Sequence, residues 1–346
     1  MSGFGRSPPQ GRGTQRVSTP LEVEPGSSSA QPEAVLEGVR KIEGRSLWQI
    51  SWMRLKRDKV ALAGGAVVLL LIVVAIFAPL ICKIIGVTPN DFHQDLVDPS
   101  LQTPIGKWNG ISADHPLGIE PVNGRDIFAR IVYGARISLL IAFLATLLSV
   151  VIGTVMGIVA GYFGGWVDTL ISRLMDIFLA FPLVLFALAL VGAIPDSVLG
   201  LSGDPLRVAL IVFIIGFFSW PYIGRIIRGQ TLSLREREFV DAARSLGARR
   251  PYILFTELLP NLIAPILVYA TLLIPTNVLF EAGLSYLGVG VRPPTASWGD
   301  MLSIAANWYQ VAPLYMVPPG LAIFITVLAF NLFGDGLRDA LDPRSR

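Results

Sequence analysis

The sequence predicts an all-α integral membrane protein with six transmembrane helices, and two observations carry this prediction. Of 346 residues, 53% are hydrophobic and 15% are charged, with a mean hydropathy of +0.61, which is too apolar for an ordinary soluble domain. The apolar residues are also gathered into blocks of roughly the 20 residues that an α-helix needs to cross a bilayer. The blocks lie at 60–82, 137–161, 174–194, 207–227, 262–281 and 314–334.

The chain ahead of the first block divides into two parts. Residues 1–45 contain many Ser, Pro and Gly and few aromatic or β-branched residues, a composition typical of a disordered tail. Trp48 and Trp52 then lie one helical turn apart, followed by a basic cluster, which predicts an interfacial helix leading into the first span within 46–82. Because basic residues stay on the cytoplasmic side of a membrane, we expect the N-terminus in the cytoplasm.

Residues 83–136 form a long polar segment between the first two blocks. Acidic and basic residues are balanced in it, so we expect it on the extracytoplasmic side. The only two histidines of the chain, His93 and His115, lie here without Cys or His ligands beside them in the sequence. We therefore expect surface histidines and no metal site.

The core of the protein is expected at 137–336, which holds the other five blocks. Gly153, Gly157, Gly161 and Gly165 recur every four residues, a spacing that lets membrane helices pack closely. We therefore assign these glycines to helix packing rather than to ligand binding.

Prolines and acidic residues near the spans leave alternatives open. The prolines are consistent with simple kinks and equally with broken helices that expose backbone to a cavity. For Asp176 and Glu281, the acidic residues nearest the spans, we expect exposure at the membrane interface. The prolines concerned are Pro182, Pro221, Pro265, Pro275 and Pro318.

The charged segment 234–260 cannot lie in lipid and predicts a helical hairpin. Its first part carries an apolar residue at i, i+3, i+4 and i+7, which is one face of a helix, and Gly247 follows where a left-handed cap would end that helix. Pro251 suits the first turn of a second helix, which we expect to end at Pro260. The residues of the apolar face are Phe239, Ala242, Ala243 and Leu246.

Two interpretations of this hairpin remain open on composition alone. Its small apolar face, rimmed by Arg, would allow a partner protein to approach the backbone closely. A cytoplasmic loop also needs Arg simply to orient the spans. Both interpretations place the hairpin in the cytoplasm with the C-terminal tail at 337–346, because this region is rich in Arg and basic loops stay on the cytoplasmic side. The basic residues in and near the hairpin are Arg225, Arg228, Arg235, Arg237, Arg244, Arg249 and Arg250.

Several kinds of chemistry are missing from the sequence. No phosphate-binding Gly-x-x-x-x-Gly-Lys-Ser/Thr loop occurs, so the chain is not expected to bind ATP, and no cofactor is expected on it. No His-Glu-x-x-His or Gly-x-Ser-x-Gly motif supports a membrane hydrolase. The basic residues form no aromatic-interleaved patch, which argues against nucleic-acid binding.

The segment 234–260 resembles the cytoplasmic loop of ABC importer permeases. That loop has a Glu-Ala-Ala start, a Gly four residues later and a Leu-Pro about a dozen residues further on. Two positions depart from the pattern: Asp241 replaces the leading Glu, and Glu257 replaces the Ile usual before Leu-Pro. Segments 115–139 and 320–344 also resemble peptide-type permeases. The matching residues of the loop are Asp241, Ala242, Ala243, Gly247, Leu259 and Pro260.

The resemblance is to the second-permease (C-type) subunit of the dipeptide/oligopeptide (peptide/nickel) family, with a type I ABC importer permease fold in a bacterial or archaeal plasma membrane. It implies a second homologous permease, an extracytoplasmic substrate-binding protein, and two cytoplasmic ABC ATPases that bind ATP and Mg. This chain would form half of an alternating-access pathway. The ATPase-coupling residues that it implies are Arg237, Phe239, Asp241, Ala242, Ala243, Leu246, Gly247, Leu259 and Pro260.

Three alternatives to a peptide permease are distinguishable. A membrane enzyme would need paired catalytic residues within the spans, and the sequence offers none. A passive channel would need no cytoplasmic docking hairpin. Nickel and oligosaccharide importers share this type of permease, so the sequence leaves the cargo open.

Overall fold

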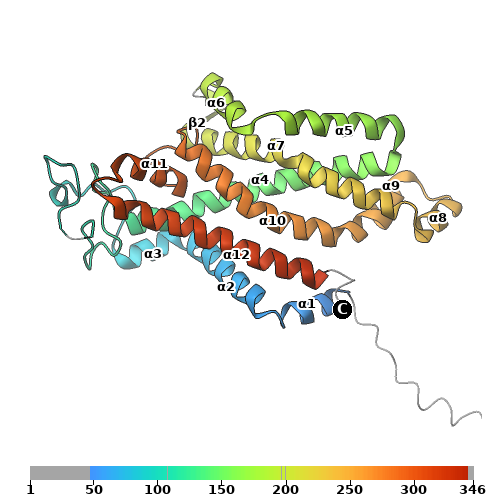
Figure 1. The fold of residues 1–346 in the computed structure, drawn as a ribbon, viewed down its shortest axis with the longest axis horizontal. Helices are drawn as coiled ribbons and strands as arrows, with labels where there is room; N and C mark the ends of the chain where they lie inside the picture. Colours follow the sequence, from blue (N-terminus) through green and yellow to red (C-terminus); the bar gives the residue numbers. More distant parts are fainter. Residues whose placement is uncertain (1–46, 107, 196, 199, 342–346) are drawn as a thin grey trace, which may run out of the picture. The chain divides into compact units, whose positions relative to one another are not determined.

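The computed structural model describes residues 47–106, 108–195, 197–198 and 200–341, and the tail predicted at 1–45 lies outside the described residues. Helices make up most of the described part, and its one small sheet is a hairpin of two two-residue strands, β1 (Ser197–Val198) with β2 (Leu201–Ser202). Figure 1 shows α8 at one end of the helical bundle and α11 with the 83–126 segment at the other. Five helical segments are long and apolar enough to cross a membrane, and α5 with α6 makes a sixth if that bent pair is one span. The predicted helical membrane architecture is therefore confirmed.

The first span is bounded by recognisable capping residues. The interfacial segment forms α1 (Leu47–Leu55), and α2 (Lys59–Ile76) follows after a turn. The carboxylate of Asp58 caps α2 by accepting hydrogen bonds from the backbone N–H groups of Val60 at 2.9 Å and Ala61 at 3.0 Å. A short continuation, α3 (Ala78–Ile85), ends at Gly86 in the left-handed conformation.

The second span, α4 (Ile127–Phe163), begins ten residues before the expected block. Asp126 caps it by accepting from the backbone N–H of Ala129 at 2.6 Å. Arg130 was assigned to the polar segment, but it is fully buried in the first turn of α4. The irregular segment therefore ends at 126 rather than at 136, because tertiary ion pairs allow a charged residue inside the helix.

Those ion pairs join distant parts of the chain. Arg130 lies 3.2 Å from Asp300 and 3.4 Å from Glu120, and Glu120 also pairs with Arg125 and accepts a hydrogen bond from the Tyr315 hydroxyl at 3.1 Å. Asp300 belongs to α11 (Trp298–Trp308), and Tyr315 to the short 3₁₀ helix Pro313–Met316. A second short 3₁₀ helix, Gln94–Leu96, lies within the irregular segment itself. This network fastens the 83–126 segment to the bundle.

Two expectations about isolated polar residues were wrong. His115 is buried, and its Nδ1 lies 2.8 Å from the Asp126 carboxylate, with the ring of His93 packed edge-on against it. Glu281, expected at an exposed end, is completely buried and accepts a hydrogen bond from the Ser285 hydroxyl at 2.8 Å. Asp176 is exposed as expected and pairs with Arg225 at 2.5 Å.

The repeated glycines pack α4 against α7 (Gly203–Leu234), as predicted. A β-carbon on Gly153 or Gly157 would lie 2.7 Å from a backbone carbonyl oxygen of α7, and one on Gly161 would lie 2.7 Å from the Thr231 side chain. Gly165, the fourth of the series, has no such neighbour within 4 Å, and instead begins α5 with a positive φ of +54°.

Prolines act differently at different positions. The expected span at 174–194 is divided into α5 (Gly165–Ala180) and α6 (Leu183–Ala193), which meet at an angle of 80° around Pro182. Pro221 instead lies inside the continuous helix α7. The final helix, α12 (Val317–Leu341), extends past 336, so the first half of the expected C-terminal tail is helical, and residues 342–346 lie outside the described residues.

Candidate functional site: the cytoplasmic hairpin and its groove

The first helix of the predicted hairpin is α8 (Glu238–Ser245), and Gly247 caps it as expected. Gly247 has a φ of +79°, and the backbone N–H groups of Gly247 and Ala248 donate to the carbonyl oxygens of Arg244 at 2.9 Å and Ala243 at 3.0 Å. This pair of bonds is the Schellman arrangement, which satisfies the last carbonyls of a helix and reverses the chain.

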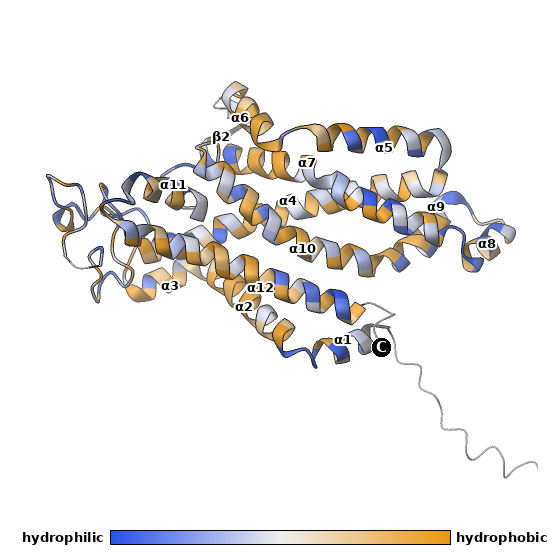
Figure 2. Cartoon of the chain, in the orientation of Figure 1, coloured by the Kyte–Doolittle hydropathy of each residue, from blue (hydrophilic) through white to orange (hydrophobic). Residues whose placement is uncertain are grey.

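The second helix of the hairpin differs from the prediction at its far end. Pro251 lies in the first turn of α9 (Arg250–Tyr252), as expected. A π-helical segment, Ile253–Leu258, then leads without interruption into α10 (Leu259–Tyr286). Pro260 therefore does not end the helix, because it falls in the first turn of α10, where a missing N–H is tolerated next to the wider π turn. Figure 2 shows how hydrophilic α8 is beside the apolar spans.

The hairpin is held against the spans by its buried face. Val240 of α8 is fully buried against Ile253 and Leu258 of the second helix. The Arg244 guanidinium lies over the ring of Tyr162 at 5.7 Å, and Arg250 lies over Phe163 at 5.6 Å. The last turn of α4 is thus in direct contact with the hairpin, so displacement of one will act on the other.

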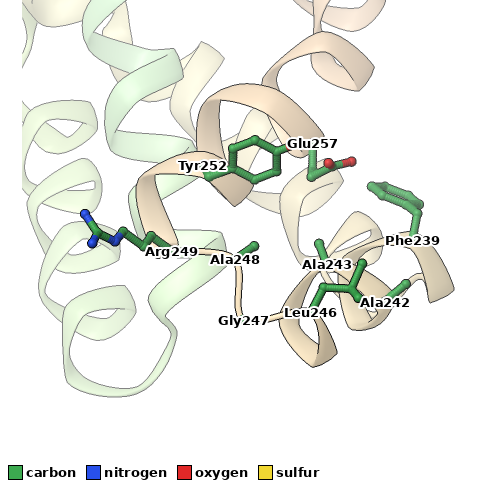
Figure 3. Close-up of a pocket in the computed structure, with 9 residues that line it drawn as sticks. All are labelled: Phe239, Ala242, Ala243, Leu246, Gly247, Ala248, Arg249, Tyr252 and Glu257. Carbon is green, nitrogen blue, oxygen red and sulfur yellow. The ribbon is translucent and has the colours of Figure 1, made fainter.

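The opposite face of the hairpin forms a groove of about 590 Å³ (Figure 3). Its apolar side chains are largely open to solvent: Leu246 is 88% exposed, Tyr252 51% and Phe239 37%. Because large apolar groups are rarely gathered on an unoccupied surface, the groove has the character of a protein contact surface. The lining residues are Phe239, Ala242, Ala243, Leu246, Gly247, Ala248, Arg249, Tyr252 and Glu257.

The structure brings five of the nine expected coupling residues together in this groove: Phe239, Ala242, Ala243, Leu246 and Gly247. The other four, Arg237, Asp241, Leu259 and Pro260, do not line it. Asp241 instead pairs with Arg244 at 3.1 Å, beside Tyr162 at the end of α4. Ala248, Arg249, Tyr252 and Glu257 complete the lining. The sequence drew attention to Arg249 as one of the basic residues of the hairpin and to Glu257 as a departure from the family pattern, but it did not place either one in a groove.

Glu257 gives the groove a specific electrostatic character. Its side chain extends toward α8 and Phe239, whereas Arg249 extends away from the groove, as Figure 3 shows. Among the described residues no cation pairs with the Glu257 carboxylate, and the Asn261 side-chain amide donates a hydrogen bond to the backbone oxygen of Glu257, not to its carboxylate, at 2.7 Å. An apolar groove with one unpaired carboxylate suits a partner that presents apolar side chains and a cation.

The described part of the chain contains no group of three or more His, Cys, Asp or Glu residues that could hold a metal ion. The groove lining also lacks a Ser, Cys or His nucleophile. Its residues are therefore suited to contact and not to catalysis.

Helices long and apolar enough to cross a membrane, with a charged hairpin at one end, are the architecture expected of a multi-pass transport permease, and comparison with known proteins agrees. The profile described as the binding-protein-dependent transport system inner membrane component matches residues 153–346, and the N-terminal transmembrane domain of oligopeptide transport permease C matches residues 46–104. This chain belongs to the binding-protein-dependent transport system inner membrane component family.

Two relatives and one solved structure illustrate the similarity. The dipeptide transport system permease protein DppC of Alkalihalophilus pseudofirmus is 41% identical over 301 residues, covering 87% of this chain and 91% of that protein. The glutathione transport system permease protein GsiD of Salmonella typhimurium is 45% identical over 300 residues, with the same coverage. The inward-facing MetNI methionine ABC transporter shares the fold, with a TM-score of 0.50, 20% identity, and coverage of 62% of this chain and 98% of that one.

Family membership establishes the general role. The chain is a permease subunit of an ABC importer and a multi-pass inner membrane protein. Permease subunits of this family carry no ATPase domain, and ATP hydrolysis belongs to a separate partner subunit.

Proposed function

We propose that this permease imports dipeptides or oligopeptides, forming half of an alternating-access pathway with a second, homologous permease. The two relatives described above carry dipeptide and glutathione transport in their names, and both cargoes are short peptide-like molecules. A substrate-binding protein would deliver the cargo on the side of the 83–126 segment, and we place the termini and the hairpin in the cytoplasm.

The groove of the hairpin carries the mechanistic part of the proposal. An ATPase subunit would dock there, with its apolar side chains against Phe239, Leu246 and Tyr252. ATP and Mg would bind only at the ATPases. When these close, movement of α8 would pass through Val240 and the Arg244–Tyr162 contact to the end of α4.

The residues implied by family resemblance divide into two groups in this proposal. Those in the groove would contact the ATPase directly. Leu259 and Pro260 would act from within the helix, by setting where α10 departs from the hairpin. Arg237 and Asp241 would contribute at the rim.

Purification of the assembled importer tests the proposal. Mass spectrometry of the ligands released from its binding protein should identify short peptides, and ATP turnover should require the ATPase subunits. A binding protein that carries only nickel complexes or oligosaccharides would reject the peptide assignment. Hydrolysis by this chain alone would reject the division of labour.

A further inference from the structure

Arg136 is a charged residue within an apolar membrane span. It lies in α4, nine residues after the first residue of that helix, and its side chain is exposed. No described residue forms an ion pair or hydrogen bond with its guanidinium. Charged side chains within spans are costly, and they normally find a partner inside the protein or reach polar surroundings. The exposed guanidinium is therefore available to an anionic group from outside this chain.

Two adjoining cavities share Arg136 and Leu140 in their walls. The larger one, of about 610 Å³, is formed by apolar side chains of four helices, with Arg136 as its only charged residue. The smaller one, of about 360 Å³, is formed largely by irregular segments beyond the helices. Besides the shared pair, the larger cavity is lined by Ile72, Ala75, Ile76, Leu139, Phe143, Ile274 and Phe330.

The depth of these cavities can be derived from helix geometry. At about 1.5 Å per residue, Ile72 and Ile76 lie about 20 and 26 Å along α2 from Lys59, whose ammonium marks one membrane surface. The apolar cavity thus lies inside a hydrocarbon layer of about 30 Å, with Arg136 near its far boundary. The smaller cavity includes Asn90 and Pro294, which lie in non-helical segments that must be outside exposed hydrocarbon.

We propose that this pair of cavities binds a phospholipid of the extracytoplasmic leaflet. The phosphate lies against the Arg136 guanidinium at the boundary between the cavities, and one acyl chain fills the apolar cavity. A guanidinium matches a phosphate with two parallel N–H donors, and the apolar lining buries methylene groups.

The lining favours lipid over the alternatives. A peptide cargo carries backbone N–H and C=O groups, and the larger cavity offers no polar side chain except Arg136 to pair with them. A lipid leaves no such group unpaired. The site also joins α2 and α4 to α10 and α12, so the bound lipid holds the first span against the core helices.

A photocrosslinking experiment tests the site in the assembled importer. The complex is placed in nanodiscs of phosphatidylcholine with a minor fraction of phosphatidylglycerol that carries a diazirine on its acyl chain. Labelled peptides are identified by mass spectrometry, and thermal unfolding of each variant checks its fold. Arg136→Gln removes the charge, whereas Leu140→Trp fills the apolar cavity and keeps the charge. Arg207→Gln is the matched control, because Arg207 lines a separate cavity near the same end of the bundle.

The expected result is labelling of α2 and α4 around the cavity, reduced about tenfold or more in both Arg136→Gln and Leu140→Trp and unchanged in Arg207→Gln. Equal labelling in all variants overturns the proposal. So does a crosslink from a photoreactive residue at Leu140 to the second permease, which would make the cavity a subunit interface. A raised KM for peptide uptake in Arg136→Gln with unchanged lipid labelling would assign the charge to cargo and also overturn it.

Discussion

The backbone N–H of Ala248 donates to the carbonyl oxygen of Ala243 at 3.0 Å, and the chain reaches this geometry through a φ of +79° at the intervening Gly247. A β-branched residue there is strained by about 1–3 kcal/mol, although no atom stands within 4 Å of the added β-carbon. We expect Gly247→Val to insert normally but to misdirect the second helix, so that ATPase association or the coupling of hydrolysis to uptake is lost.

Two control variants refine this test. Gly247→Asn should be much milder, because Asn tolerates the left-handed conformation. Ser233→Ala, near the exposed end of α7, should have little effect. Wild-type uptake and coupling in Gly247→Val, at equal membrane abundance, would show that the hairpin serves only to orient the spans.

Glu257 should determine which ATPase docks in the groove. Replacing it by Lys places like charges together if the partner presents a cation, so we expect affinity for the ATPase to fall by about tenfold or more. Glu236→Lys, exposed and outside the groove, serves as the control. Affinities measured by pull-down or interferometry at low and high salt decide the matter, since the wild-type affinity should itself weaken with salt. If Glu257→Lys bound the ATPase normally while Leu246→Asp did not, the groove would still be the docking site, but the charge of Glu257 would have no role in docking.

Gly157 should be intolerant of any larger side chain. Its β-carbon would lie 2.7 Å from the Gly224 carbonyl oxygen, so Gly157→Val must separate α4 from α7 and lower the free energy of unfolding by about 1–3 kcal/mol or more. Gly229→Ala, on the same helix pair but with no atom within 4 Å, should be neutral or slightly stabilising. Thermal unfolding in detergent compares the two, and equal melting temperatures would contradict the packing role.

Asp300 should make stability depend on pH. Burial raises the pKa of this carboxyl from 3.8 to about 6, although Arg130 and Arg125 oppose the shift. The native state therefore holds the proton more tightly than the unfolded state. Protonated Asp300 thus contributes to the free energy of unfolding below pH 3.8, and this stabilisation is lost as pH rises through 6. Over this pH range, we expect the free energy of unfolding of the wild type to fall by up to about 3 kcal/mol relative to that of Asp300→Asn. Melting temperatures of both proteins across the range measure the difference, and a constant offset would refute it.

Topology can be tested with introduced cysteines, because the native Cys82 is buried. Ser100→Cys and Ser245→Cys both lie at exposed positions. In intact cells a membrane-impermeant reagent should label the first and should reach the second only after permeabilisation. The reverse pattern would invert the proposed orientation.

Local sequence determined the parts of this protein that depend on near neighbours. Runs of about 20 apolar residues specify spans because only apolar side chains are stable in lipid, and each span is helical because its backbone groups must pair with one another there. The spacing of Gly153, Gly157 and Gly161 specified a close helix contact, and the apolar period followed by Gly247 specified α8 and its cap. Each of these signals lies within a few turns of one helix.

Only the tertiary structure decided the features that depend on distant partners. Arg130 enters α4 because Asp300, 170 residues away in the chain, compensates its charge, and Tyr315 reaches Glu120 over 195 residues. Glu257 lies in the π segment Ile253–Leu258, and its side chain extends toward α8, a separate helix that supplies the opposite wall of the groove. The sequence around each of these residues does not indicate its partner. The cost of burying a charge is offset only where the fold brings the charged residue and its distant partner together.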